Sequence, residues 1–485
     1  MKKADNSGAK NYQSEGKMES GDKIEERSGA MAVKEGEDQV NGSGQYLLAQ
    51  ILSKANLNGA YRKVVQNKGS AGIDKMEIKD LFKYLQENWE GVKKQLLTGE
   101  YKPRPVKRVE IPKPDGSGMR MLGIPTVLDR MIQQAIAQVI TPIFDEGFSK
   151  FSYGFRPGKS AHDAILQSQE YIREGFNYVV DIDLEKFFDR VNHDKLMYLI
   201  SKKIEDKNVL RLIRKYLESG VMINGVVMIT DEGTPQGGPL SPLLSNIMLH
   251  ELDVELEKRG HKFCRYADDC NIYVKSQKAG DRVMESVSDF IESKLKLKVN
   301  KEKSAVDKPS KRKFLGFSFY SSKEGVRMRL HSKTLKRVKD KVRNLTQRSK
   351  SESMEEKIDK LSSLITGWVN YFRIADMIGH CEKLDEWMRR RIRMCIWKQW
   401  KKIRTKHDNL VKFGIESSKA WEFANTRKAY WHTANSPILA TSITNTYLEK
   451  QGLLTFSTVY LSWLKTMNRR MPNGTYGGVR GQIAN

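Results

Sequence analysis

Two adjacent carboxylates, Asp268 and Asp269, are the residues of this chain with the clearest potential for chemistry. They stand in the segment 263–274, FCRYADDCNIYV, between two β-prone stretches, so they are expected at the tight turn of a hairpin. Asp is common in turns, and a bare Asp-Asp pair is ordinarily no more than that. Here apolar residues flank the pair, and like charges at a partly buried turn repel unless a cation neutralises them. The pair therefore indicates a metal site.

A second acidic cluster lies in residues 179–189, VVDIDLEKFFD, where an apolar strand ends in carboxylates and aromatic residues. Two divalent cations about 3.5–4 Å apart, bridged by carboxylates, hold the attacking and leaving oxygens in phosphoryl transfer. Mg²⁺ prefers hard oxygen ligands of this kind. One aspartate of this strand, Asp181 or Asp183, together with Asp268 and Asp269 would supply the ligands.

The elements that must position these carboxylates alternate between helix and strand. Hydrophobic periodicity predicts helices in 45–97, with a loop at 68–74, then in 129–140, in 161–174 and after Pro242. Residues 103–125 and 262–275 are typical of hairpins, 178–182 of a buried strand, and 221–229 form a short further segment. Such alternation indicates an α+β domain with a small antiparallel sheet, ending near residue 325.

Basic helical segments follow. Residues 323–406 contain 24 Lys and Arg against 10 Asp and Glu, with aromatic residues interleaved, and a less charged aromatic module follows from about residue 408. The whole chain carries +26, while residues 1–44 carry a net −2 and one aromatic residue, which predicts a disordered leader. A surplus of this size favours a polyanionic partner, either as the substrate of an enzyme or as the target of a ribosomal or chromatin binder.

Composition excludes several other classes. With 485 residues, 39% hydrophobic and 30% charged, the chain is not wholly disordered, and at roughly 100–200 residues per domain it should form two to four domains. No signal peptide or run of about 18 apolar residues is present, which predicts a cytoplasmic protein without a membrane partner. The four cysteines form no CxxC pair, so neither a disulfide framework nor a zinc ribbon is expected.

The ordered motifs resemble those of a reverse transcriptase, and more narrowly of a bacterial group II intron-encoded reverse transcriptase/maturase, from about residue 45 to near 465. The resemblance rests on seven blocks in the family's order: VEIPKPDGSGMRMLGIPT, FSYGFRPGKSAHDAI, VVDIDLEKFFDRVNHDKL, GTPQGGPLSPLLSNIML, CRYADDCNIYV, LKLKVNKEKS and FLGF. It implies a right-hand polymerase: fingers and palm with an antiparallel palm sheet at 45–325, an α-helical thumb or maturase domain at 326–406, and a small helical DNA-binding module at 407–485.

The resemblance also implies catalytic roles. Asp268 and Asp269 match the metal-binding pair, and the family's third aspartate precedes an aromatic steric gate by five residues, which selects Asp183 with Phe188 as the gate. These three aspartates would bind two Mg²⁺ ions. Phe188 would exclude the 2′-hydroxyl that distinguishes ribose from deoxyribose.

Further positions match nucleotide-binding and nucleic-acid-binding residues of the family. Lys113 and Arg120 would grip the incoming triphosphate, although a solvated strand face would also explain them, and Gln236 would line the nucleotide pocket. Lys303 is a candidate for protonating the leaving pyrophosphate. The primer and nucleic-acid contacts expected are Arg156, with either a structural or a template-contacting role, Leu315 and Gly316 at the primer end, and the thumb cations Lys398, Lys401, Lys402, Arg404 and Lys406.

The expected function is RNA-directed DNA polymerisation, with an RNA template, a DNA primer and deoxynucleoside triphosphates as substrates. The resemblance adds binding of a group II intron RNA to assist splicing, and mobility by target-primed reverse transcription into target DNA. No nuclease module with paired CxxC motifs is expected, as in the compact class often called group IIC. Two alternatives stay open: a reverse transcriptase recruited to a host role such as phage defence, and a non-catalytic RNA-binding splicing factor.

Overall fold

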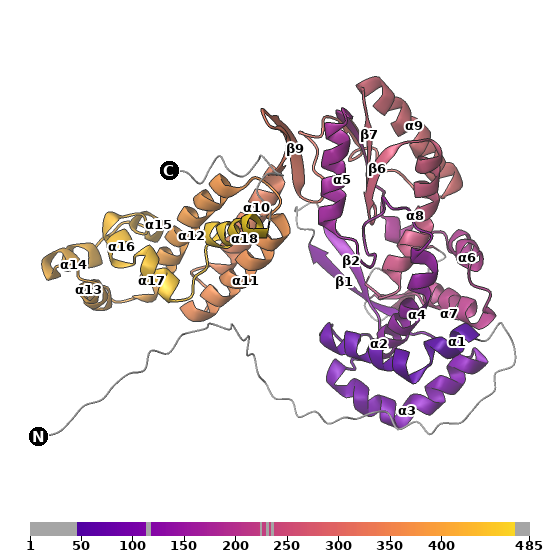
Figure 1. Cartoon of the computed structure of the whole chain (residues 1–485). Helices are drawn as coiled ribbons and strands as arrows, with labels where there is room; N and C mark the ends of the chain where they lie inside the picture. The colour runs from indigo at the N-terminus through magenta and orange to yellow at the C-terminus, as the bar shows by residue number, and fades with distance from the viewer. Residues whose placement is uncertain (1–45, 113–117, 224–225, 229–231, 234–236, 471–485) are drawn as a thin grey trace, which may run out of the picture. The chain divides into compact units, whose positions relative to one another are not determined.

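The computed structural model describes residues 46–112, 118–223, 226–228, 232–233 and 237–470 (Figure 1). The predicted leader, the last fifteen residues, and two candidate site residues, Lys113 and Gln236, lie outside this part of the chain. Within it, no helix is long and apolar enough to cross a membrane.

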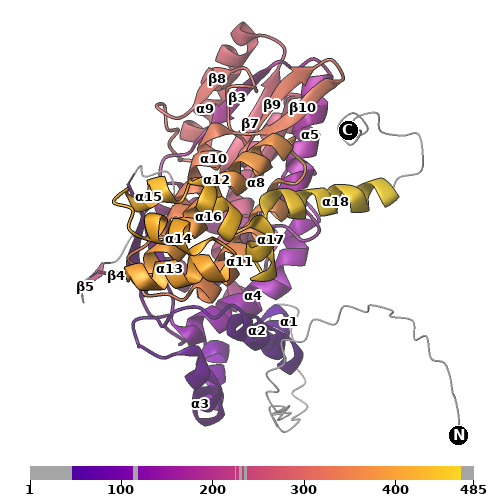
Figure 2. The same cartoon turned by 90° about the vertical axis from the view of Figure 1, so that its left-hand side faces the viewer.

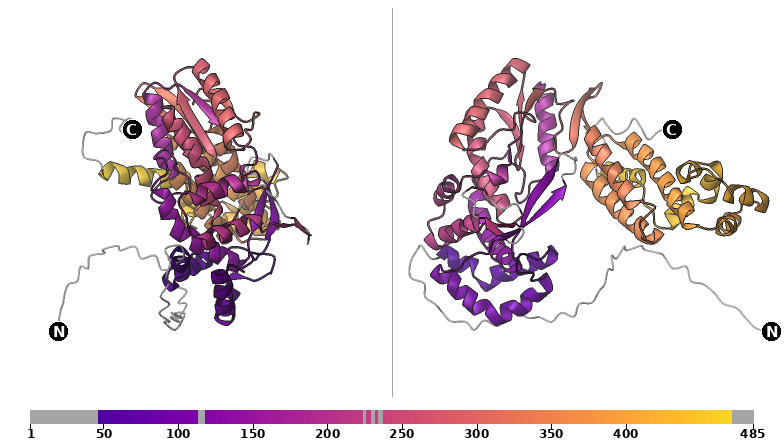
Figure 3. Two further views of the ribbon diagram at one scale, coloured as in Figure 1. Left: turned by 90° about the vertical axis from the view of Figure 1, so that its right-hand side faces the viewer. Right: turned by 180° about the vertical axis from the view of Figure 1, so that it is seen from behind.

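The first helices confirm the periodicity of residues 45–97. They are α1 (Tyr46–Ile51), α2 (Lys54–Gln66) and α3 (Ile78–Thr98), and they pack on α4 (Val127–Asp145); Figure 3 shows the first three in indigo. Ser53 caps α2 by accepting a hydrogen bond from the backbone of Asn56, and Gly99 ends α3 in the left-handed conformation. The apolar stripe of α2, including Ala60 and Val64, is buried.

The predicted hairpin at 103–125 is present as β1 (Val106–Pro112) and β2 (Met119–Ile124), which pair antiparallel. It belongs to a four-stranded sheet of order β2-β1-β4-β5, completed by β4 (Val221–Ile223) and β5 (Val226–Met228). Two helices precede β4 in the chain, α6 (His193–Ser201) and α7 (Lys207–Glu218). β1 pairs parallel with β4, whereas the other pairs in this sheet are antiparallel.

A second sheet, of order β6-β7-β3-β8, is antiparallel throughout and is the palm sheet that the sequence predicts. Its strands are β3 (Tyr178–Ile182), β6 (Lys262–Tyr266), β7 (Asp269–Val274) and β8 (Ala305–Asp307). The helices α5 (Ala161–Arg173), α8 (Ser241–Lys258) and α9 (Gln277–Lys294) contact it. Its apolar residues are buried: Val180, Phe263 and Ile272 have no exposed surface.

The strands continue past residue 325, where the sequence predicts helices. β9 (Phe317–Ser322) and β10 (Gly325–Leu330) form a hairpin, with Leu330 opposite Phe317. Met328 and Leu330 alternate with exposed or half-buried arginines, which is the period of a strand with one covered face. The boundaries expected at 325 and 406 thus fall at the start of β10 and inside α13.

The rest of the described chain is helical, as expected. Three long helices come first, α10 (Ser332–Leu345), α11 (Met354–Phe372) and α12 (Ile378–Gln399). A group of mostly short helices follows (Figure 2): α13 (Ile403–Lys412), α14 (Ser417–Ala424), α15 (Tyr430–Thr433), α16 (Pro437–Ser442), α17 (Asn445–Lys450) and α18 (Phe456–Arg470). One hydrophobic core includes residues of α5, the β9–β10 hairpin, α10 to α12 and α18.

Candidate active site and nucleic-acid interface

The register of the palm sheet brings the two acidic segments together. β3 and β7 run antiparallel, and their last pair is Ile182 with Cys270, so Asp183, the residue directly after β3, comes opposite Asp269. The β6–β7 hairpin closes with Tyr266 paired to Asp269, and its turn holds Ala267 at a positive φ of 57°. Asp183, Asp268 and Asp269 therefore gather at one end of the sheet.

This gathering of negative charge perturbs the carboxyl groups. Desolvation, and then the neighbouring carboxylates of Asp268, Asp181 and Asp183, raise the pKa of Asp269 to about 7, although the residue keeps part of its surface exposed. Burial, together with the charge of Asp183, also raises the pKa of Asp268. The described residues contain no ready-made cluster of three His, Cys, Asp or Glu ligands. The donor set nevertheless fits a divalent cation, because it supplies hard oxygens whose mutual repulsion such a cation would relieve.

Asp181, the other aspartate of this strand, is neutralised from within the protein. The guanidinium of Arg312 donates to Asp181 Oδ2 from Nε at 3.0 Å and from Nη2 at 2.6 Å. Even so, burial leaves the pKa of Asp181 raised. Asp181 therefore has a cation of its own, which leaves Asp183 as the strand's contribution to the candidate metal site.

Polar contacts from Asn300, Lys303 and Ser304 fasten Asp183 to the loop before β8. Its backbone N–H donates to Ser304 Oγ at 3.0 Å, and its carbonyl accepts from the backbone N–H of Asn300 at 2.8 Å. The ammonium of Lys303, on the same loop, lies 3.8 Å from Asp183 Oδ2. Arg312 fixes this lysine's backbone by donating from Nη2 to the Lys303 carbonyl at 2.8 Å. The loop thus places a positive charge beside the candidate metal ligand.

Beneath the Ala267–Asp268 turn lies a fully buried arginine. Arg265 pairs with Asp253 through two hydrogen bonds, at 2.7 and 2.6 Å, and neither side chain is exposed. Its remaining donors go to Asn246 Oδ1, Ser152 Oγ and the carbonyl of Ala267, at 2.8 to 2.9 Å. All five guanidinium donors are therefore satisfied, and one of them holds the backbone of the Ala267–Asp268 turn.

The backbone at Gly154 packs directly against the same turn. A Cβ placed on Gly154 would lie 2.3 Å from the backbone nitrogen of Ala267, a distance that real Cβ atoms do not reach. The Gly154 carbonyl accepts a hydrogen bond from Asn246 Nδ2 at 2.9 Å. The turn is thus packed against the backbone of Gly154, and its Ala267 carbonyl is held by the Arg265 guanidinium.

Among the expected nucleotide-binding residues, Arg120 and Phe188 lie near the aspartates. Arg120 is exposed on β2, and its charge lowers the pKa of Asp268 against the larger effect of burial. Phe188 is half-buried in a short 3₁₀ turn, Phe187–Asp189, that follows the acidic strand, and its ring contacts that of Phe187 at 5.2 Å. The ammonium of Lys303 is close to Asp183 as well, at 3.8 Å from Oδ2.

The expected primer residues form a two-residue turn before β9. Leu315 and Gly316 both have positive φ, 51° and 92°, and Phe314 and Phe317 exchange backbone hydrogen bonds across the turn. A Cβ on Gly316 would lie 2.9 Å from the ring of Phe372. The hydroxyl of Tyr371 donates to the Leu315 carbonyl at 3.1 Å, so helix α11 supports the turn.

Arg156 has the contacts of a structural residue, one of the two roles that the sequence leaves open. Its guanidinium donates to Asp145 Oδ1 and to the carbonyls of Asp145, Ser149 and Ser152, at 2.6 to 3.0 Å, and its side chain is 7% exposed. Little of it is left to contact a template.

The thumb cations lie where α12 ends and α13 begins. Lys398 and Lys406 place their ammonium groups over aromatic rings, at 5.0 Å from Tyr430 and 4.7 Å from Trp397 respectively. Lys401, Lys402 and Arg404 are exposed, and within the described residues no ion pair engages their charges. These three cations are available to phosphates.

Several supporting residues were not foreseen from the sequence. Arg265, Asn300 and Ser304 lie in blocks that resemble the family, whereas Arg312 lies two residues before the FLGF block; only the structure shows what the four residues contact. A signal was present for Arg265, because an arginine within the otherwise apolar strand FCRY must find a buried partner. Arg312 gives no such signal, because it stands among other lysines in SKRKF.

An antiparallel sheet with three aspartates at one end, followed by a basic helical region, is the arrangement expected of a polymerase that acts on nucleic acids. Residues 111–319 match the family "Reverse transcriptase (RNA-dependent DNA polymerase)", and residues 335–414 match "Group II intron, maturase-specific domain". The chain belongs to the group II intron-encoded reverse transcriptases, a family of RNA-directed DNA polymerases.

Several individual proteins are similar to parts of this chain. Protein YkfC of Escherichia coli is 33% identical over 302 residues, which cover 54% of this chain and 79% of that protein. The group II intron-encoded protein LtrA of Lactococcus lactis is 30% identical over 341 residues, 55% of each chain, so the match spans about half of LtrA. Among solved structures, a chain of a partial Cas6-RT-Cas1–Cas2 complex is 27% identical, covering 51% of this chain and 42% of that one, with a TM-score of 0.34.

Proposed function

We propose that this chain copies an RNA template into DNA from a primer 3′-hydroxyl, using deoxynucleoside triphosphates and two Mg²⁺ ions bound by Asp183, Asp268 and Asp269. The observation that carries the proposal is the β3–β7 register, which sets Asp183 opposite Asp269 in a chain of the reverse transcriptase family. When bound, the ions would stabilise the attacking and leaving oxygens of the phosphoryl transfer.

The chain's own residues would bind and orient the nucleotide. Arg120 and Lys303 would hold the triphosphate, and the Lys303 ammonium, which the loop brings within 3.8 Å of Asp183, would donate a proton to the departing pyrophosphate. Phe188 would exclude a 2′-hydroxyl by bulk. Lys113 and Gln236, which lie outside the described residues, would complete the proposed nucleotide site.

Two further groups of residues would bind the nucleic acid, one at the primer end and one along the phosphates. The Leu315–Gly316 turn, supported by Tyr371, would place the primer end, and Lys398, Lys401, Lys402, Arg404 and Lys406 would bind phosphates of the template–primer duplex or of the intron. Arg156 would act on the template only indirectly, by holding the fold around Ser149 and Ser152.

The maturase-specific match supports a second role, in which the chain binds its group II intron RNA, assists splicing and inserts the intron into target DNA. Relatives in Escherichia coli and Lactococcus lactis support a bacterial setting, and we place the activity in the cytoplasm, where RNA and chromosome meet. The same match argues against a recruited enzyme without an intron, and the three converging aspartates argue against a splicing factor without catalysis.

Primer extension tests the proposal. Wild type with an RNA template, a DNA primer and Mg²⁺ should yield cDNA, whereas Asp268→Ala/Asp269→Ala should yield none while binding the template–primer as tightly. Absence of cDNA from the wild type would refute the polymerase proposal. A splicing assay on the intron-containing transcript, with the double variant included, tests the maturase role separately, because RNA binding does not require the aspartates.

A further inference from the structure

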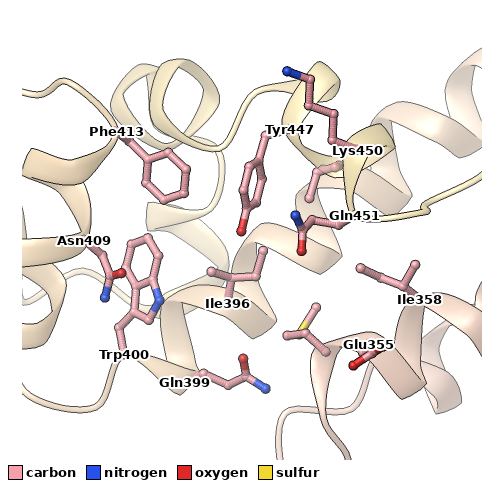
Figure 4. Close-up of a pocket in the computed structure, with 12 residues that line it drawn as sticks. Glu355, Ile358, Ile396, Gln399, Trp400, Asn409, Phe413, Tyr447, Lys450 and Gln451 are labelled. Carbon is pink, nitrogen blue, oxygen red and sulfur yellow. The ribbon is translucent and has the colours of Figure 1, made fainter.

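A pocket of about 490 Å³ lies where helices α11, α12, α13 and α17 meet, and none of the three candidate metal-binding aspartates lines it (Figure 4). Its volume is within the usual range for small-molecule sites, about 300–1,000 Å³. We propose that this pocket takes one unpaired base of an RNA bound to the helical region. The proposal rests on the proposed binding of RNA, and it names a site for it that the family match does not.

The walls of the pocket are suited to a flat, partly apolar group. Trp400 and Phe413 are stacked at 6.2 Å between ring centroids and 26° between planes, and Tyr447 meets Phe413 edge-on at 4.9 Å. Ile358 and Leu448 close the apolar side and are themselves buried. A base that leaves its helix regains its stacking energy on such aromatic surfaces.

Most of the polar side chains that line the pocket have no partner among the described residues. Within the described residues, the side-chain amides of Gln399 and Gln451 and the hydroxyl of Tyr447 make no hydrogen bond, and Asn409 uses only Nδ2, which donates to the Thr405 carbonyl at 2.7 Å. An apolar side chain of a protein partner would bury these groups without hydrogen bonds, at a cost in free energy. The edge of a nucleobase offers donors and acceptors to amides, so a base fits the pocket better.

Most of the charges at the pocket fit the phosphates of the same strand, although its lining includes the acidic Glu355 as well as Lys450. Gln399 and Trp400 of the pocket are flanked along the chain by exposed lysines, Lys398 on one side and Lys401 and Lys402 on the other. A base inserted between these residues would therefore leave its neighbouring phosphates beside lysines. A continuous duplex cannot present a base in this way, which restricts the ligand to a loop, bulge or single strand. RNA is favoured over DNA because three of the four helices lie within the maturase-specific segment.

The experiment measures binding of the full chain to fluorescently labelled 12-nucleotide probes: single-stranded RNA, the same RNA paired to its complement, and single-stranded DNA of the same sequence. Two variants alter the pocket, Trp400→Ala and the more conservative Gln399→Leu/Gln451→Leu. Their matched controls are Trp421→Ala, an exposed tryptophan outside the pocket, and Gln86→Leu on α3. Thermal melting reports whether each variant folds. If Trp400→Ala does not fold, the Gln399→Leu/Gln451→Leu variant provides the test.

The proposal expects each pocket variant to bind single-stranded RNA about 10-fold more weakly, in line with the stacking and hydrogen bonds lost, and to bind the RNA duplex as the wild type does. Both controls should bind all probes normally. Unchanged affinity for single-stranded RNA, or an equal loss on the duplex, would overturn the base pocket, and an equal loss on single-stranded DNA would overturn the assignment to RNA. Primer extension on poly(rA)/oligo(dT) should proceed normally in the variants, so failure of the polymerase proposal would be seen independently.

Discussion

Arg312 donates two hydrogen bonds to one oxygen of Asp181, at 3.0 and 2.6 Å, and both side chains are only about a quarter exposed or less. The pair lies two residues from the candidate metal ligand Asp183. The pair would keep a nearby carboxylate from competing for the proposed cation, and through the Lys303 carbonyl Arg312 also fixes the loop that carries the lysine proposed to hold the triphosphate.

Replacing this arginine should therefore impair nucleotide use. We expect Arg312→Gln to lower kcat/KM for the deoxynucleotide on the order of 10-fold, about 1.4 kcal/mol of transition-state stabilisation, with KM for the nucleotide rising more than KM for the template–primer. Arg312→Lys should be intermediate, because it keeps the charge but not the fork. Steady-state kinetics check this, with Arg259→Gln, which breaks a surface pair to Glu255, as control. Wild-type kinetics in Arg312→Gln would contradict the role.

The buried Arg265–Asp253 pair makes a prediction about stability and activity together. Arg265→Met should cost about 3–5 kcal/mol of unfolding free energy, because it leaves the Asp253 carboxylate buried and unpaired. The double variant Arg265→Met/Asp253→Leu should regain most of that stability in urea denaturation. Its polymerase activity should stay low, because the hydrogen bond to the Ala267 carbonyl is still missing. Recovery of full activity along with stability would show that the arginine does not position the turn.

Gly154 offers a test of the same turn without changing any charge. A methyl group at Gly154 would collide with the backbone of Ala267, so Gly154→Ala should displace Asp268 and lower the extension rate at least 10-fold. Gly91→Ala on α3 is the matched control, because nothing lies within 4 Å of its would-be Cβ and alanine favours a helix by roughly 1 kcal/mol. Rates measured under single-turnover conditions separate this effect from product release.

Because the pKa of Asp269 is raised, replacing this carboxyl should stabilise the fold by an amount that depends on pH. A carboxyl with a raised folded-state pKa binds its proton more tightly in the folded than in the unfolded protein, so it destabilises the fold progressively as pH rises from about 4 to about 7. Without divalent cations, the Asp269→Asn variant should therefore have a higher melting temperature than the wild type at pH 8. The difference between the two melting temperatures should be smaller at pH 5.

Mg²⁺ should reverse that comparison. Added cation should raise the melting temperature of the wild type at pH 8 and have little effect on Asp269→Asn, because the cation replaces the missing proton. Differential scanning fluorimetry with and without EDTA measures both effects. If Mg²⁺ raised the melting temperature of both proteins equally, Asp269 would not be a ligand of the cation.

Short-range patterns made much of the site predictable. The strand Tyr178–Ile182 and the hairpin around Asp268 are encoded locally, by an apolar run and by two β-prone segments about a turn, and both are confirmed. Selecting Asp183 over Asp181 came from the family's spacing to Phe188 and stays a prediction, which the Arg312 pair supports.

Contacts distant in sequence could not be read in advance. Arg312 meets Asp181 across 131 positions and Ser304 meets Asp183 across 121, and neither pairing has a periodic signature. The strand β10 was expected to be helix because its arginines fitted the basic helical composition that follows. Its antiparallel pairing with β9 decided its conformation instead.

The shared core at the β9–β10 hairpin limits how this protein can be divided. Gln169 of α5 donates to the Val326 carbonyl of β10 at 2.7 Å, and Phe317 of β9 packs on Phe372 of α11 with ring centroids 5.1 Å apart. A cut at residue 325 would expose these surfaces in both fragments, so neither half should be soluble when expressed alone. The polymerase and maturase segments thus have to be exchanged between homologues, or lost, together with the hairpin that joins them.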